Sequence, residues 1–227
     1  SYTVADLGSP TIALSSTNAT CLGSSDGSVN IGVTGGASPY TYIYAQGNTL
    51  TSNIIDEGVE NGMGNFTSSG DVNFVTNTTF SHTGSSSYHN AYTNYNNNYL
   101  TCDTTFDFTN TTEAFLNFWH IAKTRGNDDY CYIEYSNDGG SSWNKIPSAN
   151  YNGSASTYTG SYPYFDEYSY SVWGSSSSPN NTWWQEENFD LAFLAGQANV
   201  KIRFYLYSDN LYTKYGWLID DITVSAN

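Results

Sequence analysis

The stretch that decides the fold is Gly216-Trp217-Leu218-Ile219-Asp220-Asp221-Ile222-Thr223-Val224. Its apolar and β-branched residues are typical of a buried strand. Asp220 and Asp221 interrupt the run with two carboxylates, and burying both without partners would be costly. Because the chain holds only six Lys and Arg residues, we expect a bound cation or hydrogen-bond donors to meet them. Neighbours on a strand face opposite sides, so only one of the two should point inward. The alternative is an edge strand with two solvated carboxylates.

The composition around this strand indicates an all-β protein. Charged residues make up 12% of the chain and aromatic residues 17%, including 21 Tyr. Tyr, Thr, Val and Phe favour strands, whereas the abundant Asn and Gly favour turns. Short alternating segments broken by Gly, Asn and Pro predict many short strands, and no segment shows a capped helical period.

The net charge of −15 limits the possible partners. Nucleic acid and anionic membranes require basic patches, so neither is expected to bind, and sulfated glycans are disfavoured. Neutral sugars, cations and other proteins remain open. No apolar run is long enough for membrane insertion. The strand-like opening Ser1-Tyr2-Thr3-Val4 favours a segment of a longer parent chain with other domains.

Three cysteines allow at most one internal disulfide. Cys102 and Cys131 flank a segment expected to form two neighbouring strands, so we predict that they pair. Cys21 lies in a separate region and is expected to be unpaired. One disulfide fits an extracellular location better than the cytosol.

The first part of the chain, residues 1–52, has its own pattern of strand and turn residues. Ser28-Val29-Asn30-Ile31-Gly32-Val33 alternates, Gly35-Gly36-Ala37-Ser38-Pro39 predicts a turn, and Tyr40-Thr41-Tyr42-Ile43-Tyr44 predicts the returning strand. Together with Cys21-Leu22-Gly23, these segments resemble the SprB-type repeat of giant adhesins on Bacteroidota. The resemblance implies a small Ig-like β-repeat, or part of one, at the cell surface.

The second part, residues 53–227, carries a series of motifs in a fixed order. Val59-Glu60-Asn61-Gly62 comes first, Ser81-His82-Thr83-Gly84-Ser85 follows, and segments 115–120, 132–143 and 195–204 precede the closing strand. In this order they resemble the MAM-like modules of secreted bacterial peptidases and adhesins. The resemblance implies an antiparallel β-sandwich of the jelly-roll type.

The same resemblance implies a structural calcium ion. In such jelly rolls an acidic residue of the last strand and the Glu of the first motif help to hold the metal. By position these residues are Glu60 with Asp220 or Asp221. Calcium takes about six to eight oxygen ligands, and further ligands are sought among Asp56, Glu57, Asp128 and Asp129.

Ser136-x-Asp138-x-Gly140-x-x-Trp143 matches the Asp-box of sialidase-like propellers. We predict a structural hairpin in which Asp138 accepts hydrogen bonds, the glycines take positive φ and Trp143 tucks underneath. A single copy and only two arginines argue against a sialidase. The histidines lack a metal-binding spacing, and no Gly-x-Ser-x-Gly elbow frames a nucleophile. We therefore expect no catalytic residue and no enzyme.

Two tyrosine-rich clusters are candidate binding sites. Within residues 151–173 we predict a ligand-binding surface at Tyr162, Tyr164, Tyr168 and Trp173. A second cluster lies among asparagines, at Tyr88, Tyr92, Tyr95 and Tyr99. Exposed rings beside amides suit neutral sugars, and tyrosine-rich surfaces also bind proteins. The alternative is that these rings pack on strands with only their hydroxyls in water.

These patterns predict a non-catalytic adhesion or binding module of a large cell-surface or secreted protein. The expected partner is a glycan or a protein surface ligand, and the expected cofactor is structural calcium. One alternative is a purely structural stalk or spacer module. The other is an accessory module of a secreted peptidase or glycan-degrading enzyme.

Overall fold

Two units make up the chain in the computed structural model, Ser1–Asn48 and Thr49–Asn227. The structure describes residues 11–17, 28–35, 52–158, 163–174 and 178–227. In the first unit, β1 (Thr11–Thr17) pairs antiparallel with β2 (Ser28–Thr34), so that Leu14 lies opposite Ile31. The strand predicted from residue 28 is therefore present in β2, whereas Cys21 and the strand predicted at residues 40–44 lie outside the described residues.

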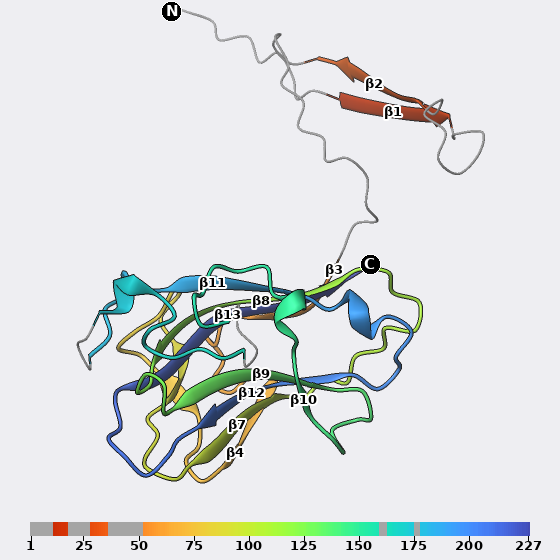
Figure 1. The fold of residues 1–227 in the computed structure, drawn as a ribbon. Helices are drawn as coiled ribbons and strands as arrows, with labels where there is room; N and C mark the ends of the chain where they lie inside the picture. The colour runs from red at the N-terminus through yellow and green to blue at the C-terminus, as the bar shows by residue number, and fades with distance from the viewer. Residues whose placement is uncertain (1–10, 18–27, 36–51, 159–162, 175–177) are drawn as a thin grey trace, which may run out of the picture. The chain divides into compact units, whose positions relative to one another are not determined.

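The second unit is a sandwich of two antiparallel sheets (Figure 1). The five-stranded sheet has the order β10 (Asn144–Lys145), β9 (Tyr130–Ser136), β12 (Lys201–Tyr207), β7 (Asn97–Cys102) and β4 (Phe66–Gly70). The six-stranded sheet has the order β11 (Gln185–Asp190), β8 (Ala114–Lys123), β13 (Gly216–Ala226), β6 (Ser87–Asn90) and β5 (Val75–Asn77), with β3 (Ser52–Glu57) also paired to β13.

The predicted all-β sandwich is confirmed. The helical segments among the described residues are single 3₁₀ turns, η1 (Ser148–Asn150), η2 (Ser171–Trp173) and η3 (Ala192–Leu194). None of the described helices is long and apolar enough to span a membrane.

Strict alternation along the strands builds the core between the sheets. On β12, Ile202, Phe204 and Leu206 are buried, while the residues between them are half-exposed. The Phe204 ring packs edge-on against Phe118 of β8 at 5.0 Å and against Trp217 of β13 at 5.7 Å between ring centroids. Burying such an aromatic side chain stabilises the fold by about 1.5–3 kcal/mol.

The quoted strand β13 is interrupted by a bulge at its two carboxylates. Its pairing with β8 shifts register between Asp220 and Thr223, and Asp221 has a φ of 46°. A bulge inserts one extra residue and breaks the alternation of faces. Asp220 and Asp221 therefore both contact one loop residue, His82, while only Asp220 is fully buried, as the sequence predicts.

The prediction of a Cys102–Cys131 disulfide is wrong, because both thiols are free and buried. The two residues lie on β7 and β9, which are not neighbours, since β12 lies between them. Cys131 is opposite Leu206 and Cys102 lies beside the pair of Thr101 with Arg203. Strand spacing and rise then separate their Cα atoms by roughly 15 Å, far beyond the ~7 Å that a disulfide allows.

Candidate functional site

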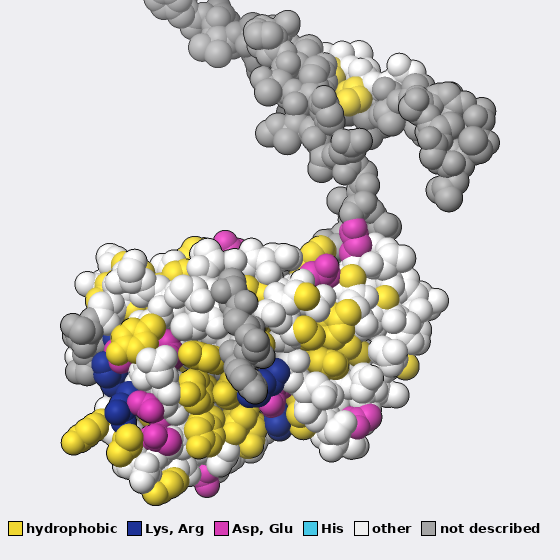
Figure 2. Space-filling view, in the orientation of Figure 1, with side chains coloured by type: hydrophobic (Ala, Val, Ile, Leu, Met, Phe, Trp, Pro, Cys, Tyr) yellow, Lys and Arg dark blue, Asp and Glu magenta, His cyan; other side chains and the backbone are white. Residues whose placement is uncertain are grey.

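The outer surface of the five-stranded sheet carries aromatic and charged side chains in cross-strand rows. Figure 2 shows hydrophobic side chains beside Lys, Arg, Asp and Glu on the sandwich. We call the outer surface of the five-stranded sheet the tyrosine face. It consists of Tyr99, Tyr130, Tyr132, Glu134, Trp143, Lys145, Arg203, Tyr205 and Tyr207. It forms because these residues alternate along their strands with core residues such as Ile133 and Phe204.

The first row is made of tyrosines. Tyr132 lies opposite Tyr205, which lies opposite Tyr99 on the next strand. The Tyr99 and Tyr205 rings stack at 4.8 Å between centroids, and Tyr132 lies 5.6 Å from Tyr205. The rings pack on one another, so that Tyr132 is only 9% exposed while Tyr99 and Tyr205 are half-exposed.

A charged row runs beside the tyrosines, with Lys145, Glu134 and Arg203 opposite one another on three strands. The Arg203 guanidinium is held by Glu134 Oε2, which accepts from Nε at 2.7 Å. Its Cζ also lies 4.1 Å from the centre of the Trp143 ring and 4.2 Å from that of Tyr99. A guanidinium fixed between two rings and a carboxylate keeps one orientation, which suits recognition of polar groups.

Lys145 occupies the other end of the charged row. Its Nζ lies 3.4 Å from the centre of the Tyr132 ring, a short cation–π contact. Partial burial lowers the pKa of Lys145, while Glu134 opposes that change. Burial likewise raises the pKa values of Tyr132 and Tyr205, so their hydroxyls stay protonated and can both donate and accept hydrogen bonds.

The Asp-box hairpin positions Trp143 on this surface. Asp138 accepts hydrogen bonds from Ser136 Oγ at 2.6 Å and from Ser142 N at 2.9 Å, and these bonds hold its pKa below the usual range. Gly139 and Gly140 have φ values of 74° and 97°. The Trp143 indole donates to Gly140 O at 3.1 Å. The predicted structural role of the motif is therefore confirmed.

The predicted aromatic residues are only partly brought together. Tyr162 lies outside the described residues. Tyr164 is half-buried and packs edge-on against Tyr130 of the tyrosine face at 4.6 Å. Tyr168 is 58% exposed. Trp173 is fully buried and its indole donates to Trp183 O, so its prediction as a ligand-binding ring is wrong.

The tyrosine face itself was missed as a site, although the sequence contains its signal. Tyr130-x-Tyr132-x-Glu134 and Lys201-x-Arg203-x-Tyr205-x-Tyr207 place polar-aromatic residues at every second position of two strands. The pattern indicates one sheet face, but it does not show that the two strands are neighbours.

Of the predicted metal ligands, Glu60, Asp220 and Asp221 bind one loop, residues 82–86. Asp220 is fully buried and its Oδ2 accepts from His82 N at 2.8 Å. Asp221 Oδ2 contacts His82 Nδ1 at 2.6 Å, and its Oδ1 accepts from Thr83 Oγ1 at 2.6 Å. Glu60 accepts from the backbone amides at positions 85 and 86.

Asp128 and Asp129 lie elsewhere, in the turn between β8 and β9. Asp128 pairs with Arg125 at 3.1 Å, and Asp129 accepts from the Tyr92 hydroxyl at 2.7 Å. Asp220 lies opposite Trp119, four residues before the end of β8 at Lys123, so this turn is not part of the 82–86 cluster.

The described side chains do not form a calcium cage. No group of three or more His, Cys, Asp and Glu side chains in the described ranges is arranged to hold a metal. Around Asp220 and Asp221 the neighbours are N–H and O–H donors, whereas calcium needs oxygen acceptors around it. Hydrogen-bond donors thus meet the two carboxylates here, and calcium binding stays a prediction.

Burial gives Asp220 an unusual titration. Burial raises the pKa of Asp220 from 3.8 to about 7. The negative charge of Asp221 adds to this rise, whereas the hydrogen bond from His82 opposes it. In contrast, the hydrogen bonds from Ser85 and Ser86 lower the pKa of Glu60.

These features define residues 52–227 as a two-sheet β-sandwich module with a polar-aromatic face on one sheet. Residues 13–48 match the family model of the SprB repeat. The chain therefore joins an SprB-type repeat to a β-sandwich, as the sequence predicts.

Solved structures are similar to the sandwich at the level of the fold. The CBM22-1 xylan-binding domain of Paenibacillus barcinonensis Xyn10C has a TM-score of 0.46 at 10% identity, covering 79% of this chain and 97% of that domain. The K3 cleaved adhesin domain of Lys-gingipain from Porphyromonas gingivalis has a TM-score of 0.47 at 15% identity, covering 77% and 98%. No curated protein sequence matches the chain.

Proposed function

We propose that the sandwich is a non-catalytic glycan-binding module of a cell-surface or secreted protein, and that the tyrosine face is its binding surface. One observation carries the proposal. Tyrosine hydroxyls and ring edges lie in register with the Lys145–Glu134–Arg203 row across three neighbouring strands. This arrangement offers a line of fixed donors and acceptors to an extended polar chain.

The chemistry of the face suits sugars. Sugar hydroxyls both donate and accept, as protonated Tyr hydroxyls do, and the carboxylate and guanidinium of the charged row supply stronger partners. Sugar C–H groups can pack against the ring edges. Arg203 and Glu134 already hold each other at 2.7 Å, so a ligand does not have to order them when it binds.

The charge distribution favours binding at this face over the rest of the surface. All six Lys and Arg residues lie at two places, and three of them, Lys145, Lys201 and Arg203, belong to β10 and β12 of this sheet. Elsewhere the chain, with its net charge of −15, is predominantly acidic. A neutral polysaccharide meets no electrostatic barrier at the tyrosine face. The SprB-type repeat supports a surface-exposed or secreted parent protein.

The test is binding of the whole chain to a panel of neutral polysaccharides, by affinity electrophoresis and calorimetry. We expect Tyr205→Ala and Arg203→Ala to weaken binding about tenfold or more, the loss of about 1.4 kcal/mol or more. Val75→Ala, which shortens an exposed side chain on β5 of the other sheet, is the control. Far-UV dichroism and melting show that each variant is folded.

If the wild-type chain bound none of the glycans, this result would contradict the proposal and favour a spacer module. Binding that survives both face substitutions would place the ligand elsewhere. Hydrolysis of a bound glycan would contradict the non-catalytic role.

A further inference from the structure

The loops at one end of the sandwich present the two most exposed aromatic rings among the described residues of the second unit. We call residues 93–96 and 208–212 the distal loops. Tyr212 is 80% exposed, Tyr95 is 70% exposed and Leu211 is 42% exposed. Single exposed rings are common, but apolar side chains that gather in one exposed patch mark ligand or partner sites. At the left end of the sandwich in Figure 2, hydrophobic side chains protrude beside Lys and Arg.

The distal loops are tied to each other and to the body. Tyr95 N donates to Asp209 O at 2.7 Å, and Asn94 Nδ2 donates to Asn210 O at 3.1 Å. Asp209 N in turn donates to the buried Asp129 at 2.9 Å. The exposed rings therefore stand on ordered backbone, which reduces the entropy lost when a ligand binds.

Tyr95 adopts a strained conformation. Its φ is 58°, in the left-handed region that residues other than glycine rarely adopt. Such strain concentrates at functional sites. In Tyr95 the strained backbone holds a large ring in water, and neither packing of the ring nor burial of its hydroxyl explains this conformation.

A hollow of about 300 Å³ lies between the loops, lined by Asn94, Asn210, Leu211 and Tyr212. This volume lies at the lower end of the range for small-ligand sites. Asn94 uses its Nδ2 to bind the opposite loop. No described residue is hydrogen-bonded to Asn94 Oδ1 or to the side-chain amide of Asn210, so both can serve a ligand.

Arg125 stands behind Tyr212, with its Cζ 5.7 Å from the centre of that ring. Its Nε pairs with Asp128 at 3.1 Å, while its buried Nη1 has no hydrogen-bond partner among the described residues. An unsatisfied buried donor is uncommon in folded proteins.

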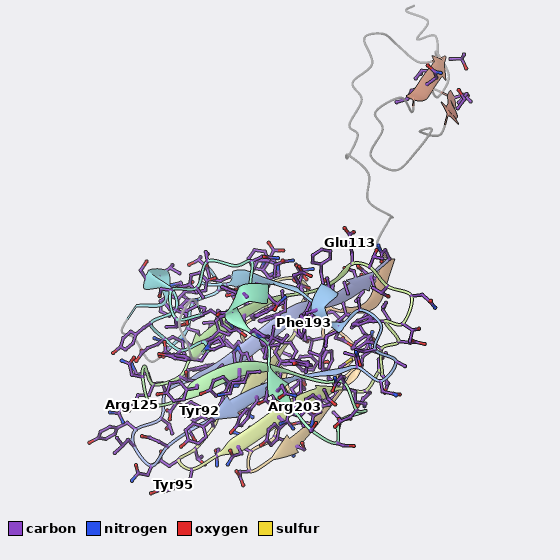
Figure 3. The ribbon with its side chains drawn as sticks, turned by 45° about the vertical axis from the view of Figure 1, so that its right-hand side comes forward. Tyr92, Tyr95, Glu113, Arg125, Phe193 and Arg203 are labelled. Atoms are coloured by element: carbon purple, nitrogen blue, oxygen red, sulfur yellow. The ribbon has the colours of Figure 1, made fainter. Side chains whose placement is uncertain are left out.

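The distal loops lie far from the place where the sandwich begins and ends. Ser52 pairs with Ala226 at one end of β13, whereas Gly216 begins β13 at the other. Eleven strand residues span roughly 35 Å. In Figure 3, Arg125 and Tyr95 lie at one end and Glu113 at the opposite end. The distal loops therefore lie at the end of the sandwich opposite Ser52 and Ala226.

We propose that the distal loops form a second binding site, which takes one neutral sugar residue in the hollow. Its ring packs on Tyr212 and Leu211, and its hydroxyls bind the Asn94 and Asn210 amides. A small hollow with two amides fits a single sugar ring better than the flat apolar core of a protein interface. The site does not depend on the tyrosine face, and together the two would make the module bivalent.

The test is an NMR titration of the labelled chain with methyl glycosides of neutral hexoses, pentoses and 6-deoxyhexoses. We expect at least one glycoside to shift the amide signals of residues 93–96 and 208–212. Tyr212→Ala and Asn210→Ala should each weaken that binding about tenfold or more. The matched control Tyr205→Ala should leave it unchanged while it impairs the tyrosine face.

Three results would overturn the proposal. The first is the absence of distal-loop shifts with every glycoside. The second is shifts that persist unchanged in Tyr212→Ala. The third is binding of the distal loops to a protein without any response to sugars. Because the two sites are read by different variants, failure of one leaves the other interpretable.

Discussion

Asp220→Asn tests whether a buried carboxylate at the β13 bulge opposes folding at neutral pH. The folded pKa of Asp220 is raised from 3.8 to about 7 by burial. The folded protein therefore binds a proton that the unfolded chain has released between these pH values. The contribution of protonated Asp220 to the free energy of unfolding is fully present below pH 3.8 and is lost as pH rises to about 7.

The magnitude follows from the shift. Each pKa unit corresponds to about 1.4 kcal/mol, so ionising Asp220 removes about 4 kcal/mol of unfolding free energy by pH 8. Asn cannot ionise, but it replaces one acceptor oxygen that meets His82 N or Asp221 N, a loss of about 1 kcal/mol. The variant should therefore be slightly less stable than wild type near pH 4 and about 3 kcal/mol more stable near pH 8.

The assay is urea unfolding followed by tryptophan fluorescence between about pH 4 and 8, with a chelator present throughout. The difference between variant and wild type separates the contribution of Asp220 from the pH dependence of the rest of the protein. Glu60→Gln is the matched control of opposite sign. The lowered pKa of Glu60 means that its contribution is present above its unfolded pKa and disappears as pH falls. A difference between Asp220→Asn and wild type that stays constant with pH would refute the reasoning.

Three further predictions concern the thiols, a buried ion pair and calcium. Cys102 and Cys131 should both be alkylated after denaturation without reductant, and a mass that shows them linked would contradict the structure; in the native protein, burial raises the pKa of Cys102 to about 11 and both should be inert. Lys123→Met should destabilise the fold by about 1–3 kcal/mol in urea unfolding. The substitution removes the buried hydrogen bonds of Lys123 to Glu167 at 3.1 Å and to the carbonyl oxygens of Trp173 and Gly174, while Lys214 still pairs with Glu167. An unchanged midpoint would show that these bonds add nothing. If calcium binds at the bulge, adding it to chelated protein at pH 8 should raise the melting temperature of wild type but not of Asp220→Asn, and equal melting of wild type with and without calcium would remove the metal.

Local patterns were sufficient to predict the fold. Short alternating segments predict an all-β chain with many short strands, and the alternating segment 28–33 is present in β2. The Asp-box hairpin was equally readable, because its hydrogen bonds join residues at most four apart. Such short-range features depend on neighbouring residues alone.

Strand order was the information that the sequence lacked. Cys102 and Cys131 appear to flank neighbouring strands along the chain, but β12, which comes some 70 residues later, lies between them. The same insertion creates the tyrosine face, because it brings Tyr205 between Tyr132 and Tyr99. The disulfide error and the missed site therefore have one cause.

Burial of single residues was also beyond the sequence. Trp173 and Tyr168 belong to one aromatic run, yet the first is fully buried and the second is 58% exposed. The bulge at Asp221 is a similar case, because one residue with positive φ turns two carboxylates toward the same loop. No periodicity announces such a change of side.

The pairing of Ser52 with Ala226 has a mechanical consequence. Tension applied through these two residues pulls on the open end of the β3–β13 ladder, so its hydrogen bonds would break one after another, as in a zipper. Strands loaded lengthwise must instead break many bonds at once. When the sandwich is pulled through Ser52 and Ala226, it should therefore begin to unfold at β3 and at low force.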